Sequence, residues 1–167
     1  MPVERFSADH PLWDSYLTHL DRVDMARWVV DMDGCAKPDI ICLGAIVEDS
    51  VAGHITLRVQ DMRVPVPGRD DAQTTIPGAD GLPLRETFIN TFAVDVEYRR
   101  QGHGRALQTA AIALTKALGC YQIRSWTPFE TPVNYATMIA LGYAVHPALT
   151  TTEHGRTLGG VYFIQTV

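Results

Sequence analysis

The sequence predicts one α+β domain, built on a single, mostly antiparallel sheet of six to seven strands with helices on both faces. The chain has 167 residues, which is the size of one ordinary domain. Hydrophobic residues make up 46% of it and charged residues 20%, as in globular proteins. The expected elements neither alternate strictly between strand and helix nor consist of strands alone, so helices packed on a mixed sheet are the natural arrangement.

The first part of the chain predicts a strand, a helix and a hairpin. Residues 3–6 are expected to form a short strand. Apolar residues then recur at helical spacing over 11–23, which predicts a helix, in one piece or two, that ends before the turn at 31–34. Residues 40–62 are rich in β-branched side chains and are interrupted by the polar turn 48–50, which is typical of an antiparallel hairpin.

Residues 63–84 carry seven prolines and glycines and almost no periodicity, which predicts a long loop inserted into the domain. Loops of this length are often functional, and a mobile surface insertion is the alternative. The rest of the chain predicts, in order, a strand over 85–96, a helix from Gly104 to Gly119, a strand over 121–127, a helix from Pro132 to Ala140, a strand after Gly142 and a last strand over 159–167.

Charge and composition exclude several classes of protein. The net charge is −5 and the isoelectric point is near 5.6, which disfavours a nucleic-acid binder. No apolar run reaches the length of a membrane span, and no secretory signal precedes the first strand. Cys35, Cys42 and Cys120 form no C-x-x-C pair, so we expect reduced thiols in a cytoplasmic protein. The six histidines show no metal-binding spacing, and no metal is expected.

The sharpest motif lies between the strand over 85–96 and the helix that follows it. Gly102 and Gly104 remove side chains, so a ligand can approach the backbone there. The first N–H groups of a helix lack partners, and the helix dipole favours an anion beside them. Arg99, Arg100 and Arg105 add positive charge at the same end. The motif therefore predicts a phosphate or pyrophosphate site.

Two common phosphate-binding motifs do not fit this segment. The G-x-x-x-x-G-K-S/T sequence of P-loop enzymes is absent. A dinucleotide fingerprint needs a third glycine where Leu107 stands, and it belongs near the start of a β-α-β unit.

Residues 92–104 resemble the acetyl-CoA site of the GNAT N-acetyltransferases. The Q/R-x-x-G-x-G/A signature of that family is filled here by Arg99, Gly102 and Gly104. The L-G-Y sequence at 141–143 resembles the family's L-G-F/Y after its last helix. The element order fits as well, so the resemblance extends in architecture to the whole domain.

The resemblance implies a GNAT fold and acetyl-CoA as co-substrate. It places pantetheine along the central strand and the pyrophosphate on the backbone N–H groups between Arg100 and Arg105, and it puts Thr131 where the family has an asparagine near its last helix. The residues that it assigns to the cofactor are Phe92, Ala93, Val94, Arg99, Arg100, Gln101, Gly102, His103, Gly104, Arg105 and Thr131.

The catalytic groups match the family less closely. The family's acidic tyrosine, four residues before the L-G-Y glycine, is replaced by Met138, and Tyr135 lies one turn earlier on the same helix face. The family's base on the central strand corresponds to Phe88 or Asn90, with Glu86 two residues further back. The candidates are therefore Glu86 and Asn90 for the base and Tyr135 for the acid, with His54 and Asp61 of the hairpin as alternative bases.

The predicted function is direct acetyl transfer from acetyl-CoA to a primary amine on a small molecule or peptide. The first helix and the segment 63–84 are expected to wall the acceptor site. Two alternatives remain, a GNAT-fold protein that binds acyl-CoA without catalysis and a different nucleotide-binding enzyme. The resemblance also makes a homodimer possible, and neither nucleic acid nor a membrane is an expected partner.

Overall fold

The computed structural model describes residues 2–131, 134–151 and 155–167. Its elements are β1 (Val3–Phe6), α1 (Trp13–Arg22), α2 (Ala26–Val29), β2 (Ile40–Val47), β3 (Ser50–Asp61), β4 (Arg63–Val66), β5 (Arg69–Thr75), β6 (Arg85–Val94), the 3-10 turn η1 (Val96–Tyr98), α3 (His103–Ala117), β7 (Gln122–Pro128), α4 (Tyr135–Ala140), β8 (Ala144–Thr151) and β9 (Thr157–Thr166). Seven strands form one sheet in the order β1-β2-β3-β6-β7-β9-β8. Neighbours are antiparallel except β6 and β7, which are parallel. The α+β prediction is confirmed.

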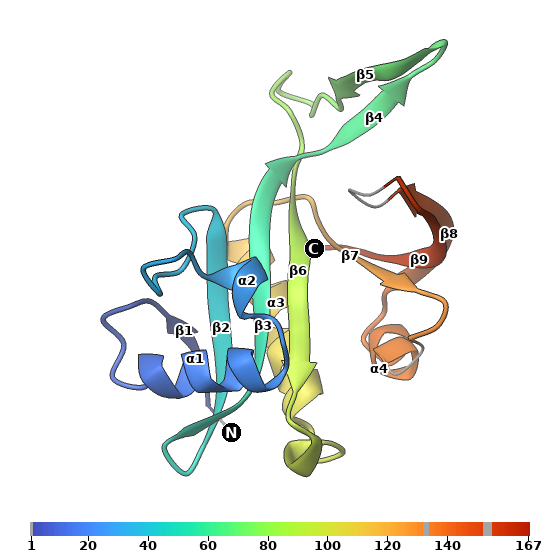
Figure 1. Ribbon diagram of the computed structural model, residues 1–167. Coiled ribbons are helices and arrows are strands. Elements are labelled where there is room, and N and C mark those ends of the chain that lie inside the picture. The colour runs from blue at the N-terminus through green and yellow to red at the C-terminus, as the bar shows by residue number, and fades with distance from the viewer. Residues whose placement is uncertain (1, 132–133, 152–154) are drawn as a thin grey trace.

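Helices cover both faces of the sheet, with α1 and α2 on one face and α3 on the other (Figure 1). The α1 face holds one apolar cluster, centred on Tyr16 and Leu20 against β2 and β3. The α3 face holds the larger cluster, in which Leu107 and Ala111 pack on Ile55 and neighbouring strand residues. The right-handed crossover from β6 to β7 through α3 explains the single parallel pair.

The helical segment expected from residue 11 to before the turn at 31–34, in one piece or two, is two helices. The first ends at Arg22, and Asp24 then takes a left-handed conformation with φ of 55°. Met25 N–H donates to the Leu20 carbonyl across this turn, so the chain changes direction before α2 begins. The turn of the hairpin is as predicted, because Glu48 and Asp49 both have positive φ.

The prediction of a loop over 63–84 is wrong for the first half of that segment. Strands β4 and β5 pair as an antiparallel hairpin, and Figure 1 shows it projecting beyond the end of β3 and the start of β6. The remaining residues fold back on its base, where Leu84 N–H donates to the Ile76 carbonyl. Strand β4 has four residues, one of them a proline, and strand β5 is polar. Neither strand carries the longer apolar alternation that would reveal it in the sequence.

The structure also bears on the membrane and disulfide expectations. In the part of the chain that is described, no helix combines the length and the hydrophobicity that a membrane crossing needs. Cys42 and Cys120 are buried and Cys35 is exposed, and all three are free thiols.

Candidate active site

The central feature of the site is the place where β6 and β7 separate. The two strands pair only as far as Phe88 and Arg124. Beyond that point β7 continues beside β9, and β6 runs on to Val94 paired with β3 but not with β7. A cavity of about 220 Å³ opens in this gap. Its walls are residues of β6 and β7 together with Gln108 of α3 and Met138 of α4.

A β-bulge bends β6 at the cavity. Thr91 faces Thr56 on β3, whereas Ile89 faces the next residue of β3. Asn90 is therefore the extra residue of the bulge, and such a residue is aimed out of the regular ladder. Its Nδ2 donates to the Trp28 carbonyl at 3.2 Å, which holds α2 against the rim of the cavity.

The predicted anion site lies at the start of α3, directly after β6. Gly102 caps the helix with φ of 91°, a conformation that favours glycine. Arg100, two residues earlier, also has a left-handed φ of 63°. The N–H groups of the first turn have no acceptor within the helix. A Cβ on Gly104 would lie 3.3 Å from the Phe92 ring, so a side chain at this position would press against β6 and the ring would have to shift.

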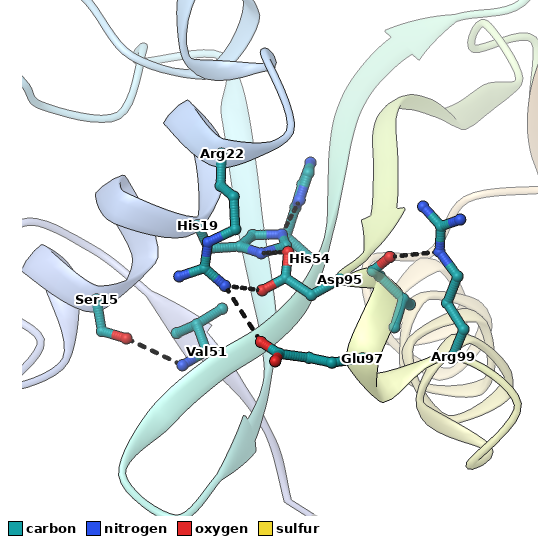
Figure 2. A network of polar contacts seen from close by, with 9 residues as sticks. Ser15, His19, Arg22, Val51, His54, Asp95, Glu97 and Arg99 are labelled. Carbon is teal, nitrogen blue, oxygen red and sulfur yellow. Dashed lines mark hydrogen bonds and ion pairs between the residues drawn. The ribbon is translucent and has the colours of Figure 1, made fainter.

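The three arginines of the motif do not all have the same role. Arg99 Nε donates to the Val94 carbonyl at 3.0 Å, so this side chain closes the end of β6 (Figure 2). Arg100 and Arg105 are exposed beside the helix start. Gln101 donates to the Glu97 carbonyl at 2.8 Å and shapes the loop. A pyrophosphate therefore fits this cradle through backbone N–H groups and two free cationic side chains.

His103, the first residue of α3, is buried, and among the described residues its Nδ1 has no hydrogen-bond partner. Its ring lies edge-on to Tyr98, with 5.9 Å between centroids. An unpaired buried nitrogen is costly unless a ligand or water completes it. This atom is a second indication that a polar ligand binds at the start of α3.

The remaining residues predicted for the cofactor lie on β6 and before α4. Phe92 lines the cavity, and Ala93 and Val94 continue the same strand, paired with β3. Thr131 is exposed and donates its N–H to the Pro128 carbonyl, and it does not line the cavity. Asn134, which caps α4, lines it instead. Pro132, where the sequence predicts this last helix to begin, lies outside the described part of the chain, and α4 begins at Tyr135.

Tyr135, the candidate acid, lies apart from the cavity. Its ring packs edge-on against Phe163 with 5.0 Å between centroids, and within the part of the chain that is described its hydroxyl has no partner. Met138 is the residue of α4 that faces the cavity, and it is 2% exposed. This geometry gives Tyr135 a packing role.

Glu86, the candidate base, is buried at the closed end of the β6–β7 pair. Its two oxygens accept hydrogen bonds from Gln60 at 2.8 Å and from Gln122 at 2.7 Å. The Arg124 guanidinium forms a bidentate ion pair with the same carboxylate. Glu86 does not line the cavity, and its lone pairs are used within the protein. The geometry thus gives it a structural role in joining three strands.

The two alternative bases lie in different surroundings. Asp61 ends β3 opposite Arg85, at the hairpin end of the sheet. His54, in the middle of β3, is fully buried and belongs to a chain of polar contacts. Its Nδ1 lies 2.8 Å from His19 Nε2, and His19 Nδ1 lies 3.0 Å from Asp95 Oδ1. These partners come from α1 and from the end of β6, and no local sequence signal connects them.

The two rings are held neutral by their surroundings. Burial, together with the neighbouring His19 ring, lowers the pKa of His54 to about 3. Burial also lowers the pKa of His19 and outweighs the Asp95 carboxylate, which acts in the opposite direction. The groups facing the two rings are Tyr16 and Arg22 on α1, Thr91 on β6 and Asp95 at its end.

These neutral rings predict a loss of stability on acidification. An unfolded histidine has a pKa near 6.5, so below that pH the unfolded chain binds protons that the folded one excludes. For His54 alone, the free energy of unfolding is expected to fall by roughly 2 kcal/mol between pH 6.5 and pH 5. Urea unfolding at both pH values measures it. His54→Gln should flatten the dependence, whereas the exposed His146→Gln should not; equal slopes in both variants would contradict the assignment.

The sequence model of the acetyltransferase (GNAT) family matches residues 5–148. None of the curated proteins compared with the sequence is significantly similar to it.

Several solved structures share the fold at low sequence identity. The Arabidopsis thaliana NAA60 structure in complex with acetyl-CoA has a TM-score of 0.65 and 9% identity, and the match covers 99% of each chain. An aminoglycoside 6'-N-acetyltransferase with coenzyme A has a TM-score of 0.63 and 16% identity over 99% of this chain and 97% of the other. The Escherichia coli ribosomal-protein-S18-alanine N-acetyltransferase has a TM-score of 0.60 and 14% identity, and the match covers 99% of this chain and 94% of the other.

Proposed function

Because this chain belongs to the GNAT acetyltransferase family, we propose that it transfers the acetyl group of acetyl-CoA directly to a primary amine. One observation carries the proposal. The open seam between β6 and β7 holds the cavity, and the start of α3 lies just beyond the end of β6. A ligand with an anionic end and an extended arm fits such a site, with the arm in the seam and the anion on the helix.

The chain offers a distinct group for each part of acetyl-CoA. The N–H groups that follow Gly102, with Arg100 and Arg105, bind the pyrophosphate. The backbone of β6 from Ile89 to Val94, which has no strand partner in the seam, binds the pantetheine amides as a strand would. The thioester then lies in the cavity near the bulge.

Polarisation of the thioester carbonyl requires a fixed donor at that position. A backbone N–H of β6 beside the bulge meets this requirement, because the bulge leaves it outside the ladder. Such a donor stabilises the oxyanion of the tetrahedral intermediate, and the loss of one costs about 100-fold to 1,000-fold in other enzymes. The low polarity of the surrounding core strengthens the interaction.

The acceptor amine reaches the thioester from the side of α2 and α4. Met25 before α2 and Asn134 before α4 line the cavity on that side. Two of the similar structures are an aminoglycoside N-acetyltransferase and a ribosomal-protein-alanine N-acetyltransferase. Small molecules and proteins are thus both used on this fold, and we propose an amine acceptor of either kind.

A second candidate function is an acyl-CoA-binding protein without catalysis. The observation that favours it is Met138, a side chain that cannot donate a proton, at the position of α4 that faces the cavity. Calorimetry and a thiol-release assay separate the candidates. Transferase and sensor both bind acetyl-CoA more tightly than NAD, whereas a dinucleotide enzyme reverses that order. Only a transferase releases CoA faster when amines from a panel are added.

The hairpin predicts a separable effect on acceptor choice. Because β4 and β5 project from the end of the sheet away from the start of α3 (Figure 1), replacing residues 65–84 by a short Gly/Ser linker should leave acetyl-CoA affinity within about twofold. The relative rates over the amine panel should change. Calorimetry and the thiol-release assay give the two readouts. Lost CoA binding with an unchanged acceptor profile would show that the hairpin serves the cofactor instead.

A further inference from the structure

A continuous chain of buried hydrogen bonds runs from the cavity to the surface on the α1 face. It starts at Thr91, whose Oγ1 lies 3.0 Å from His54 Nε2. It continues from His54 to His19 at 2.8 Å and from His19 to Asp95 at 3.0 Å. Arg22 ion-pairs with the other Asp95 oxygen, and Figure 2 shows this outer half of the chain between α1 and β6.

The hydrogen bonds of this chain can point in only one direction when both rings are neutral. The Asp95 carboxylate only accepts, so His19 must carry its proton on Nδ1. His19 Nε2 then accepts from His54 Nδ1, and His54 Nε2 accepts from the Thr91 hydroxyl. Thr56 completes the order, because its oxygen accepts the Thr91 N–H at 3.1 Å and its hydroxyl donates to Thr91 Oγ1 at 2.7 Å. Every donor has an acceptor.

The two ends of this hydrogen-bond chain, Thr91 and Arg22, lie in different environments. Thr91 is a wall residue of the cavity, adjacent to the bulge. At the other end, the Arg22 side chain is 51% exposed and also faces Glu97, 3.8 Å away at the surface. The interior members, His19 and His54, are fully buried. The chain therefore joins the reaction space to a solvated ion pair.

We propose that Thr91, His54, His19 and Asp95 form a proton relay that serves acetyl transfer. The relay takes the proton from the attacking amine and returns it to the leaving thiolate. This inference rests on the proposed function. Thr91 is the catalytic residue of the four, since it lines the cavity in which the thioester is proposed to lie, and the other three are positioning residues that act through it.

The step balances in both directions. When the amine nitrogen bonds to the acetyl carbon, its N–H proton passes to Thr91 Oγ1 and the Thr91 proton passes to His54 Nε2. The His54 Nδ1 proton passes to His19 Nε2, and the His19 Nδ1 proton passes to Asp95, which becomes a neutral acid. When the C–S bond breaks, the same shifts run backwards and a proton reaches the sulfur. Each ring regains its first tautomer, and the electron pair of the C–S bond leaves with the thiolate.

Two observations favour a relay over a purely structural network. Burying two imidazoles and a carboxylate costs free energy that an apolar core of the same shape would not. The cavity also lacks the usual acid on α4, because Met138 faces it. The relay, by holding a proton, acts as the proton donor that α4 does not provide.

The tautomers test the relay without any activity measurement. The ¹⁵N-edited NMR spectrum of the imidazoles at pH 7 should show His19 and His54 neutral, both with the proton on Nδ1. A ring protonated on Nε2 alone, or a charged His19, breaks the required order and overturns the relay. This readout holds even if the wild-type protein releases no thiol with any amine, in which case it is the proposed function that fails.

Kinetics test the relay in the active enzyme. Thr91→Val and Asp95→Asn should each lower kcat by about 100-fold or more, with KM for acetyl-CoA and the CD spectrum unchanged, and Thr91→Ser should restore most of the rate. The double variant should be no slower than either single one, since the members act as a unit. Multiplicative losses, or wild-type kcat in a folded Thr91→Val protein, would overturn the relay. The matched control is Thr87→Val, a buried hydroxyl on β6 that bonds to Thr115 away from the cavity.

Discussion

Replacement of Gly104 by valine is expected to abolish acetyl-CoA binding in a folded protein. The new Cβ would lie 3.3 Å from Phe92 and 3.8 Å from Val94 Cγ2, and its methyl groups would cover the free N–H groups at the start of α3. Hydrogen bonds to a charged group contribute about 1.5–3 kcal/mol each, so losing two of them lowers the affinity by at least about 100-fold. Calorimetric titration with acetyl-CoA measures this loss.

The matched control for this variant is Ala117→Val. It places the same β-branched side chain at an exposed position at the far end of α3, where no ligand is expected. Its affinity for acetyl-CoA should equal that of the wild type. If folded Gly104→Val bound acetyl-CoA as tightly as Ala117→Val, the cofactor would not lie on this helix.

Among the substitutions proposed for this protein, Glu86→Leu should cause the largest loss in the free energy of unfolding. Glu86 is 1% exposed, and its removal leaves the partly buried Arg124 guanidinium without its ion pair and two glutamine amides without their acceptor. Breaking a buried ion pair costs about 3–5 kcal/mol. The exposed pair of Arg58 and Asp39 is the control, and Asp39→Asn should cost under about 1 kcal/mol. Urea unfolding measures both.

The same residue separates a structural role from a catalytic one. Glu86→Gln keeps part of the hydrogen bonding, and its kcat/KM should stay within about tenfold of the wild type under conditions where the protein is folded. A loss of 100-fold or more at unchanged stability would make Glu86 the base after all, and the structural role argued from its contacts would be wrong.

Local patterns in the sequence were sufficient for most of the fold. The apolar stripe of α3, the β-branched hairpin of β2 and β3, and the glycines of the anion motif each lie within a few contiguous residues. Their physical meaning is therefore readable before any tertiary contact is known. The hairpin of β4 and β5 was missed because its strands bury no face.

The polar interior of the site was not predictable in the same way. His19, His54 and Asp95 are separated by 35 and 41 residues, and only the packing of α1 on the sheet brings them together. The sequence shows only the place of Glu86 on the central strand, whereas its partners Gln60 and Arg124 come from neighbouring strands. A single sequence gives no signal for such pairings, because each of these residue types is usually found on the protein surface.

The most direct test of the proposed reaction is identification of its product. Wild-type protein and Gly104→Val are incubated with acetyl-CoA and the amine panel, and the amines are examined by mass spectrometry while free thiol is counted. The account predicts at least one amine that gains a single acetyl group, with one CoA thiol released for each, and no product with Gly104→Val. Tight binding of acetyl-CoA by the wild type with no acetylated amine and no thiol release would contradict it.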